Sequence, residues 1–402
     1  LLDGAPLFNP YHLGGLFSAI DPDAIATLEV MPGGMPASEG DRASGVVKVW
    51  TRDGGRDRLR GHGALGLVSS RLGVDGPLPT GSGSYLVSAR RTYFDLMTKG
   101  AYELGWIETP FPYSFTDAHA KITQDVGSTG RLNVSGYIND ERVHTPREIE
   151  PNDRTTFSWG TRAGSMAYRQ PLGGSVLANV TLAGTSFDGS FDAVQLYHAP
   201  GGGLVADTSL YGRITMRDWI ADASLTWYGR RHRLRGGLQL DDYGFRYRFR
   251  VEDEVVTDPG DVDAGDADEV DDLFATLGRT AGITTIAAYL EDEWDLGNRL
   301  SLRLGIRALH AAELGTEWMP RAGARYALSD RLSLTLAAGR YAQAIHSLRD
   351  EESALASIVP YELLVPAAGS TGFLVAEDIT AGFEYRVPDT RLRVDGYYKR
   401  YP

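Results

Sequence analysis

Ser301-Leu302-Arg303-Leu304-Gly305-Ile306-Arg307-Ala308 is the stretch that decides the fold. Its even-numbered positions are apolar, and its odd-numbered positions are small or charged. Because successive side chains of a β-strand point to opposite faces, Leu302, Leu304 and Ile306 share one face. Arg303 and Arg307 then lie on the other face. The pattern predicts a strand with one apolar side and one polar side.

The same alternation recurs through most of the chain, for example over residues 131–138 and 390–398. We predict fifteen strands, which cover residues 60–68, 69–78, 84–94, 112–125, 130–142, 155–170, 175–189, 207–228, 232–250, 283–295, 300–311, 317–328, 332–346, 373–387 and 390–402. This rhythm is typical of a transmembrane antiparallel β-barrel with an apolar outside and a polar lumen. An Arg that faces lipid at the bilayer midplane costs about 2–4 kcal/mol, so Arg303 and Arg307 are expected inside.

The connections between the predicted strands alternate in length. Short ones such as 127–129 and 229–231 follow the even-numbered strands. Those after the odd-numbered strands are mostly long, such as 143–154, 190–206 and 251–282, with two short exceptions near 68 and at 312–316. Outer-membrane barrels have short turns at one rim and long loops at the other. The asymmetry therefore supports the barrel prediction.

The composition excludes several function classes. The chain has 402 residues, a net charge of −13 and no Cys. The negative charge argues against a nucleic-acid partner, and the missing thiols exclude disulfides and thiolate metal sites. Sequence motifs of hydrolases, phosphate-binding loops and zinc proteases do not occur. We therefore predict no catalytic residues, no cofactor and no metal site, although an enzyme site built from distant strands stays an open alternative.

Residues 1–57 do not follow the barrel rhythm. They are rich in turn signals, with strand candidates at 27–30 and 46–50 and one or two helical turns expected over 12–20. The segment is predicted to be a small mixed α/β unit that precedes the barrel.

Several motifs in this segment resemble the plug domain of TonB-dependent outer-membrane receptors. They are LLDGAPL at 1–7, NPYHL at 9–13, DAIATLEV at 23–30 and GVVKVWT at 45–51. The stretch YLVSARRTY at 85–93 resembles the first barrel strands of the same family. The resemblance is greatest to the branch whose precursors carry a carboxypeptidase-regulatory-like N-terminal domain.

The resemblance implies that residues 1–57 are the C-terminal part of the plug and residues 58–402 the N-terminal two-thirds of the barrel. Fifteen strands of an implied 22 would then be present, and both ends are expected to be internal to a longer protein. It also implies an outer-membrane location in a Gram-negative-type bacterium, contact with outer-membrane lipid, and a partner, TonB with ExbB–ExbD, bound by an upstream plug segment.

The function that the resemblance implies is energised uptake of a scarce nutrient. The ligand is an unknown small molecule such as a siderophore, vitamin, glycan or peptide. Two alternatives remain at this stage, a passive channel or porin and an outer-membrane adhesin or enzyme scaffold.

Two groups of candidate site residues follow. Asn9, Tyr11 and His12 are predicted to contact ligand at the plug apex; the alternative is plug folding and packing against the barrel. Glu39 and Arg42 are predicted to form a latch between plug and barrel wall; the alternative is an ordinary solvated turn.

Two further patterns are less specific. The acidic stretch 251–272 has carboxylates for Ca²⁺ or a cationic ligand, but it lacks the EF-hand pattern and reads better as a solvated, self-repelling loop. Seven aromatic residues are expected to mark the membrane interfaces, namely Trp106, Phe111, Tyr113, Phe115, Trp159, Trp227 and Trp294, although Trp106 in an outer loop could contact ligand instead.

Overall fold

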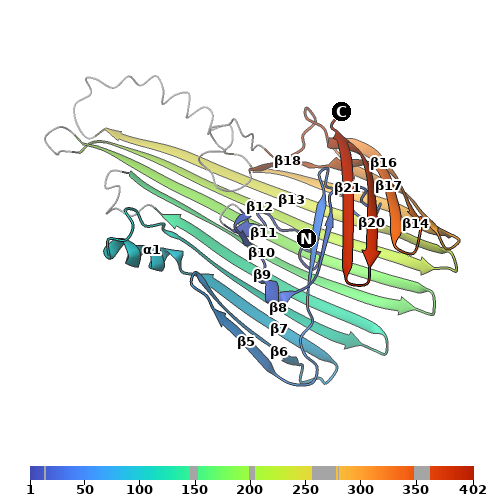
Figure 1. Cartoon of the computed structure of the whole chain (residues 1–402). Helices are drawn as coiled ribbons and strands as arrows, with labels where there is room; N and C mark the ends of the chain where they lie inside the picture. Colours follow the sequence, from blue (N-terminus) through green and yellow to red (C-terminus); the bar gives the residue numbers. More distant parts are fainter. Residues whose placement is uncertain (13–14, 145–152, 199–203, 256–277, 279, 348–362) are drawn as a thin grey trace.

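The computed structural model describes residues 1–402 except 13–14, 145–152, 199–203, 256–277, 279 and 348–362. Among the described residues, no helix has the length and apolar character needed to cross a membrane. One antiparallel sheet of fifteen strands dominates the molecule (Figure 1). Its strands are β5 Arg60–Leu65, β6 Ser69–Pro77, β7 Gly83–Thr92, β8 Tyr113–Val126, β9 Gly130–His144, β10 Asp153–Leu172, β11 Val176–His198, β12 Leu204–Tyr228, β13 His232–Val255, β14 Thr280–Leu296, β15 Leu300–Ala311, β16 Gly315–Ala327, β17 Leu332–Gln343, β20 Leu374–Val387 and β21 Thr390–Arg400.

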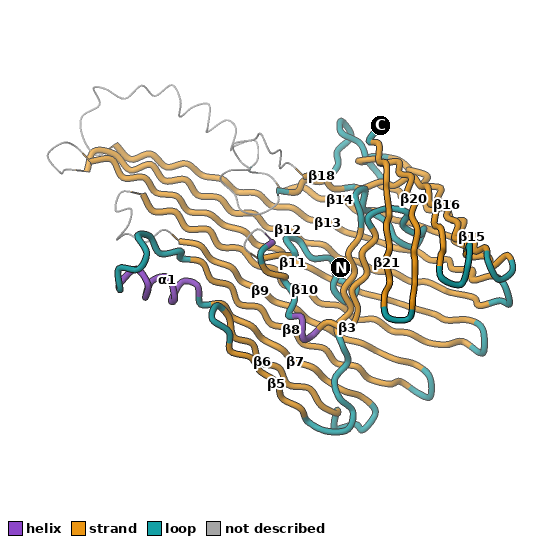
Figure 2. Tube along the Cα trace, in the orientation of Figure 1, coloured by secondary structure: helices purple, strands orange, loops and turns teal. Residues whose placement is uncertain are grey.

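The strands follow one another across the sheet in chain order, from β5 at one edge to β21 at the other, with β20 beside β17. The sheet curves around the N-terminal segment, residues 1–57, which lies against its concave face (Figures 1 and 2). The predicted mainly β class and the fifteen strands are confirmed. Some predicted strands were too short: β11 continues to His198 and β13 to Val255, each into a stretch expected to be a loop.

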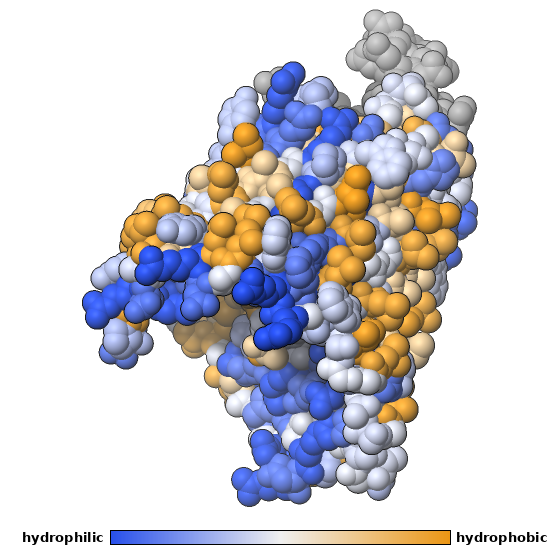
Figure 3. Space-filling view, turned by 90° about the vertical axis from the view of Figure 1, so that its right-hand side faces the viewer, coloured by the Kyte–Doolittle hydropathy of each residue, from blue (hydrophilic) through white to orange (hydrophobic). Residues whose placement is uncertain are grey.

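The period of two in the sequence separates the two faces of the sheet. In β14, Thr285, Ala287 and Tyr289 are buried on the inner face, and Ile286 and Leu290 are exposed on the outer face. Neighbouring strands are in register, so outward apolar side chains form rows across the sheet. One such row contains Ile122, Val134, Met166, Leu182, Ala221, Leu240 and Ile286. Hydrophobic side chains cover much of the right-hand flank of the molecule in Figure 3.

The inner face carries the charged side chains that the alternation placed there. Arg307 is fully buried and pairs with Asp41, and Arg303 donates to the Gly34 carbonyl at 2.6 Å. The prediction that both arginines face inward is confirmed. The aromatic residues divide between the faces. Trp227 and Trp294 point outward, but Tyr113, Phe115 and Trp159 are buried in the inner cluster, so the interface expectation was wrong for these three.

Within the stretch 12–20, where helical turns were predicted, the chain forms a two-stranded pair, β1 Tyr11–His12 and β2 Phe17–Ser18. Gly15, between the two strands, has a φ of +100°, which favours glycine. Residues 13–14 lie outside the described part of the chain, so the helical turns stay a prediction. A helix that the sequence reasoning missed, α1 Phe94–Glu103, lies in the connection after β7 and has no side-chain N-cap to signal its start.

The other short elements are η2 Pro22–Ala24, which Asp21 caps, and the pair β18 Ile345–Ser347 and β19 Leu364–Pro366. Within the N-terminal segment, β3 Ile25–Met31 pairs with β4 Val46–Thr51. Leu2, Ile20 and Val49 pack on Tyr137 of the sheet, which gives the segment a small apolar contact with the wall.

The end of the N-terminal segment approaches β7 closely at Gly54. A Cβ placed there would lie 1.9 Å from the Tyr85 carbonyl oxygen. We expect Gly54→Ala to loosen the segment by about 1–3 kcal/mol, because the backbone of a paired strand cannot move away. The measurement is the rate of proteolysis within residues 1–57 in the assembled full-length protein. Gly174→Ala, where nothing lies within 4 Å, is the matched control and should leave the rate unchanged.

Candidate functional site

The inner face of β8 and β9 supplies a cluster of buried polar side chains. Asp117 on β8 and Glu141 on β9 are each 2 % exposed, and both point toward the N-terminal segment. They do so because odd-numbered positions of both strands face inward. Two carboxylates buried this deeply need cationic or donor partners.

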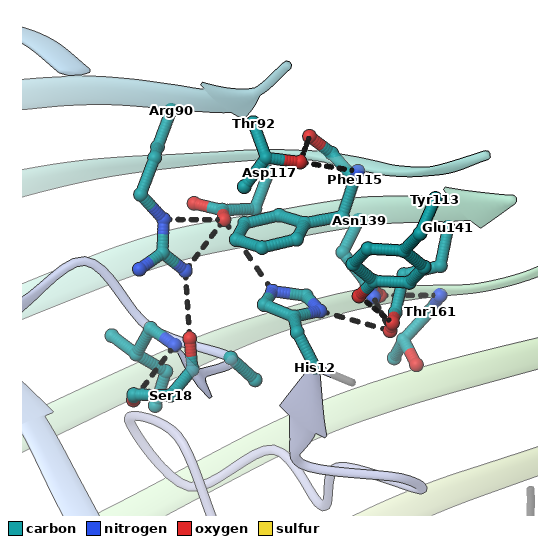
Figure 4. A network of polar contacts seen from close by, with 12 residues as sticks. His12, Ser18, Arg90, Thr92, Tyr113, Phe115, Asp117, Asn139, Glu141 and Thr161 are labelled. Atoms are coloured by element: carbon teal, nitrogen blue, oxygen red, sulfur yellow. Dashed lines mark hydrogen bonds and ion pairs between the residues drawn. The ribbon is translucent and has the colours of Figure 1, made fainter. Parts of the chain in front are cut away.

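His12 of the N-terminal segment lies between these carboxylates. Its Nδ1 is 2.9 Å from Glu141 Oε1, and its Nε2 is 3.4 Å from Asp117 Oδ2 (Figure 4). The imidazole ring stacks on Phe115 at a centroid distance of 3.8 Å, and the residue is 0 % exposed. The His12 side chain is therefore enclosed by Asp117, Glu141 and Phe115 of the wall.

Arg90 on β7 completes the charge balance. Its Nε and Nη2 donate to Asp117 Oδ2 at 2.8 and 2.7 Å. The same Nη2 donates to the Ser18 carbonyl of the N-terminal segment at 2.7 Å. Arg90 thus contacts the segment directly as well as through the shared carboxylate.

Neutral donors hold the second carboxylate. The Tyr113 hydroxyl donates to Glu141 Oε2 at 2.6 Å, and Asn139 Nδ2 donates to Glu141 Oε1 at 3.3 Å. Thr161 Oγ1 donates to the Phe8 carbonyl at 3.1 Å, which extends the cluster to the chain before His12. We call His12, Arg90, Asp117 and Glu141 with these donors the His12 network.

The pKa of His12 is raised above its ordinary value. Burial acts to lower the pKa of the imidazole, but the hydrogen bonds and charges of Asp117 and Glu141 outweigh it. The charged imidazolium is therefore the form that the wall stabilises.

The predicted ligand residues all lie in this region. His12 contacts the wall, Tyr11 is half-buried, and Asn9 is buried in a left-handed conformation with a φ of +55°. The Asn9 Oδ1 atom has no hydrogen-bond partner among the described residues. A direct role of Asn9, Tyr11 and His12 in ligand contact stays a prediction. Sequence reasoning missed Arg90, Asp117 and Glu141 as partners of His12. The alternation of β7 to β9 indicates that they face inward, but it does not indicate which residues of the N-terminal segment they meet.

A second polar contact joins the N-terminal segment to the opposite part of the wall. Three inward arginines of β15 and β16 form hydrogen bonds with residues 32–44. They are Arg303, Arg307 and Arg321, and we call them the arginine clamp. Arg303 and Arg321 donate to backbone carbonyls of that stretch, and Arg321 also lies over the Tyr341 ring at 4.4 Å. Backbone carbonyls accept these donors whatever the side chain, so the sequence of 32–44 shows little of this contact.

Arg307 makes the one side-chain ion pair of the clamp. Its Nη2 is 3.0 Å from Asp41 Oδ2 and 2.9 Å from Gln239 Oε1, and both charged side chains are at most 3 % exposed. A Cβ on Gly40 would lie 2.1 Å from Arg307 Nε, so the guanidinium packs on a backbone that has room only for glycine.

The two residues of the predicted latch divide their contacts. The Glu39 carboxylate pairs with Lys48 inside the N-terminal segment, and only its backbone carbonyl contacts Arg321 of the wall. Arg42 does face the wall. Burial acts to lower the pKa of its guanidinium, but the interactions with Tyr243, Asp218 and Asp41 outweigh burial and raise the pKa. A latch role of Glu39 and Arg42 stays a prediction, and Asp41, between them in sequence, was missed.

A polar cleft of about 530 Å³ lies between the segment and the wall. Its lining includes Lys48, Arg169, Asn179 and Arg235, of which the last three lie near the short turns of the sheet. Among the described residues, no group of three or more His, Asp or Glu side chains is placed to hold a metal ion. Of the acidic stretch 251–272, residues 256–272 lie outside the described part of the chain.

The comparisons with known proteins agree with this architecture. A family model described as TonB dependent receptor-like, beta-barrel matches residues 82–402. A mutant of the ferric enterobactin receptor PfeA from Pseudomonas aeruginosa is similar in fold, with 15 % identity, a TM-score of 0.64 and coverage of 100 % of this chain and 63 % of the receptor. The siderophore receptor PirA from Acinetobacter baumannii is similar in fold as well, with 14 % identity, a TM-score of 0.62 and coverage of 99 % of this chain and 62 % of the receptor.

The RagAB peptide importer is also similar, with 9 % identity, a TM-score of 0.62 and coverage of 94 % of this chain and 59 % of the importer chain. At these identities the likeness concerns the fold alone. The chain spans about 63 % of the length of the PfeA structures. No curated protein sequence matches the chain.

The raised pKa of His12 makes attachment of the N-terminal segment depend on pH. The stabilisation is complete below the unfolded value of about 6.5 and is lost as the pH rises through the higher folded value. We expect the segment to become more sensitive to protease between pH 6 and pH 9. In His12→Gln this added sensitivity should disappear, and an identical pH profile in both proteins would contradict the assignment.

Removal of one partner of the buried Asp41–Arg307 pair should be costly. We expect Arg307→Met to weaken attachment of the segment by about 3–5 kcal/mol, because Asp41 stays buried without its cation. Asp41→Leu combined with Arg307→Met should cost less than Arg307→Met alone. The readout is denaturant-dependent proteolysis of residues 1–57.

Arg325→Met is the matched control for that experiment. Arg325 lies on the same strand as Arg321, but its side chain is mostly exposed. Its Nη2 atom lies 3.7 Å from Glu384 Oε1. Its loss should cost less than about 1 kcal/mol. Equal effects of Arg307→Met and Arg325→Met would show that burial of the pair is not what holds the segment.

Proposed function

The chain belongs to the TonB-dependent receptor family, and we propose that it serves in energised uptake of a scarce nutrient across the outer membrane of a Gram-negative-type bacterium. The observation that carries the proposal is the match of the family's barrel model to residues 82–402. The ligand is a siderophore, vitamin, glycan or peptide.

We propose further that residues 1–57 act as the plug of this receptor and residues 58–402 as part of its barrel. The segment lies within the curve of the sheet and is held by the His12 network and the arginine clamp. Both contacts are polar, so water can replace their hydrogen bonds when the segment moves. A contact of the same size between apolar side chains would instead expose hydrophobic surface to water when the segment moves.

The proposed energy source is TonB, with ExbB–ExbD, which pulls on the plug. The cleft of about 530 Å³ between segment and wall lies toward the short turns, which form the periplasmic rim in outer-membrane barrels. Displacement of the segment would widen this cleft into an exit for the ligand. The proposal gives the chain no catalytic step.

We expect uptake to require both the receptor and TonB. The experiment compares strains with and without the full-length gene, each with and without TonB, for uptake of labelled ferric siderophores, corrinoids, glycans and peptides. Uptake only in the strain with both components supports the proposal and identifies the ligand class. Receptor-dependent uptake that ignores TonB would indicate a passive channel, and no receptor-dependent uptake of any ligand would contradict a transport role.

A further inference from the structure

The outward face of β9 to β13 changes character along the strands. On β12 the outward positions from Trp227 up to Trp219 are apolar, apart from the small residues between them. Two residues further toward the long connections stands Arg217, about 7 Å along the strand. Tryptophan at the top of an apolar face is typical of the edge of a bilayer. The outward face of β12 therefore carries basic side chains just beyond the expected edge of the bilayer.

Exposed arginines lie on this outer face beyond the apolar rows. We call six of them the outer arginine patch: Arg142, Arg162, Arg213, Arg217, Arg246 and Arg248; Arg250 of β13 is exposed beyond them. The register brings them together, since one row across the sheet runs Ser114, Arg142, Ser158, Ser190, Arg213 and Arg248. That row contains no carboxylate, and its Ser158 and Ser190 hydroxyls are hydrogen-bonded to each other at 2.8 Å.

Arg213 and Arg248 stand directly opposite each other on β12 and β13. Like charges in this position destabilise a sheet unless an anion lies between them. Within the described part of the chain, none of the six patch arginines has an ion-pair or hydrogen-bond partner. The inward arginines Arg90 and Arg307 are by contrast each paired with a buried carboxylate.

The patch also has a concave shape. A cleft of about 920 Å³ on this face is lined by Arg142, Arg162, Arg213 and Arg248, together with Ser158 and Ser190. Five acidic residues also line it. Asp95 lies 3.9 Å from Arg91, and Glu141 pairs with His12 on the inner face, which leaves Asp140, Asp188 and Asp192 on the outer face. Asp188 already accepts hydrogen bonds from Thr215 at 2.9 Å and Ser186 at 3.4 Å. Guanidinium groups bind phosphate in a bidentate way, and the serine hydroxyls can add further hydrogen bonds.

We propose that the outer arginine patch binds the phosphorylated headgroup of a lipid in the outer leaflet, of the lipopolysaccharide class. The inference rests on the outer-membrane placement in the proposed function and goes beyond it. A lipid is favoured over a soluble anion because the patch continues the lipid-facing side of the sheet. From Arg217 to Arg213 it extends about 13 Å along the strand, which suits a large headgroup with several phosphates rather than a single one.

The test uses the full-length protein purified in mild detergent, with retained lipopolysaccharide measured by mass spectrometry and phosphate analysis. Each basic residue at a charged lipid surface contributes about fivefold to binding, so Arg213→Gln with Arg248→Gln should weaken retention about 25-fold. Arg230→Gln with Arg231→Gln removes two exposed arginines from the opposite end of the same two strands and should change nothing.

Several outcomes would overturn the inference. They are equal retention in the wild type and the patch variant, equal loss in the control variant, or undiminished binding of enzymatically dephosphorylated lipopolysaccharide in nanodiscs. Release of the lipid by millimolar inorganic phosphate would show a general anion site instead. Arg213→Lys with Arg248→Lys keeps the charge and should retain most of the lipid, which keeps the test valid if the neutral variant assembles poorly.

The readout also separates this inference from the proposed function. Lipid retention does not depend on a transported ligand or on TonB. A protein that retains lipopolysaccharide but imports nothing would contradict only the transport proposal. A protein that imports a ligand through TonB but retains no lipid would contradict only the role of the outer arginine patch.

Discussion

Charge buried on the inner face of the sheet is the constraint on which the rest of the structure depends. Arg307 and Asp117 are almost completely buried, and an isolated ion in such a place costs several kcal/mol. The N-terminal segment supplies Asp41 to the first and His12 to the second. Sheet and segment therefore stabilise each other, because each supplies an oppositely charged partner to buried charges of the other, with Arg90 of the sheet sharing Asp117 with His12.

The two contacts differ in how they are built. The His12 network uses side chains on both sides and places an imidazole against Phe115, so its strength follows the protonation of one ring. The arginine clamp uses mostly backbone carbonyls of residues 32–44 as acceptors. Only the pair of Asp41 and Arg307 adds a side-chain charge. One contact is thus sensitive to pH, and the other is held mainly by shape and donor geometry.

Parity gives the same residue type two different roles. Inward arginines meet carbonyls and carboxylates, as Arg303 and Arg307 do with the segment, whereas the six arginines of the outer arginine patch meet no partner in the described chain. Arg90 and Arg91, adjacent in sequence, face opposite sides: Arg90 is buried against Asp117, and Arg91 is exposed on the outside, 3.9 Å from Asp95. A shift of one residue in register would exchange these environments.

The sequence by itself determined the number of strands, their approximate bounds and which arginines face inward, because a period of two is local and survives in any β-sheet. It did not determine β1 and β2, α1 or the lengths of β11 and β13, where turns and packing prevail over the local sequence pattern. Only the tertiary structure decided that His12 meets Asp117 and Glu141, and that Asp41 rather than Glu39 meets Arg307. These partners lie more than a hundred residues apart, and only curvature of the sheet around the segment brings them within hydrogen-bond distance.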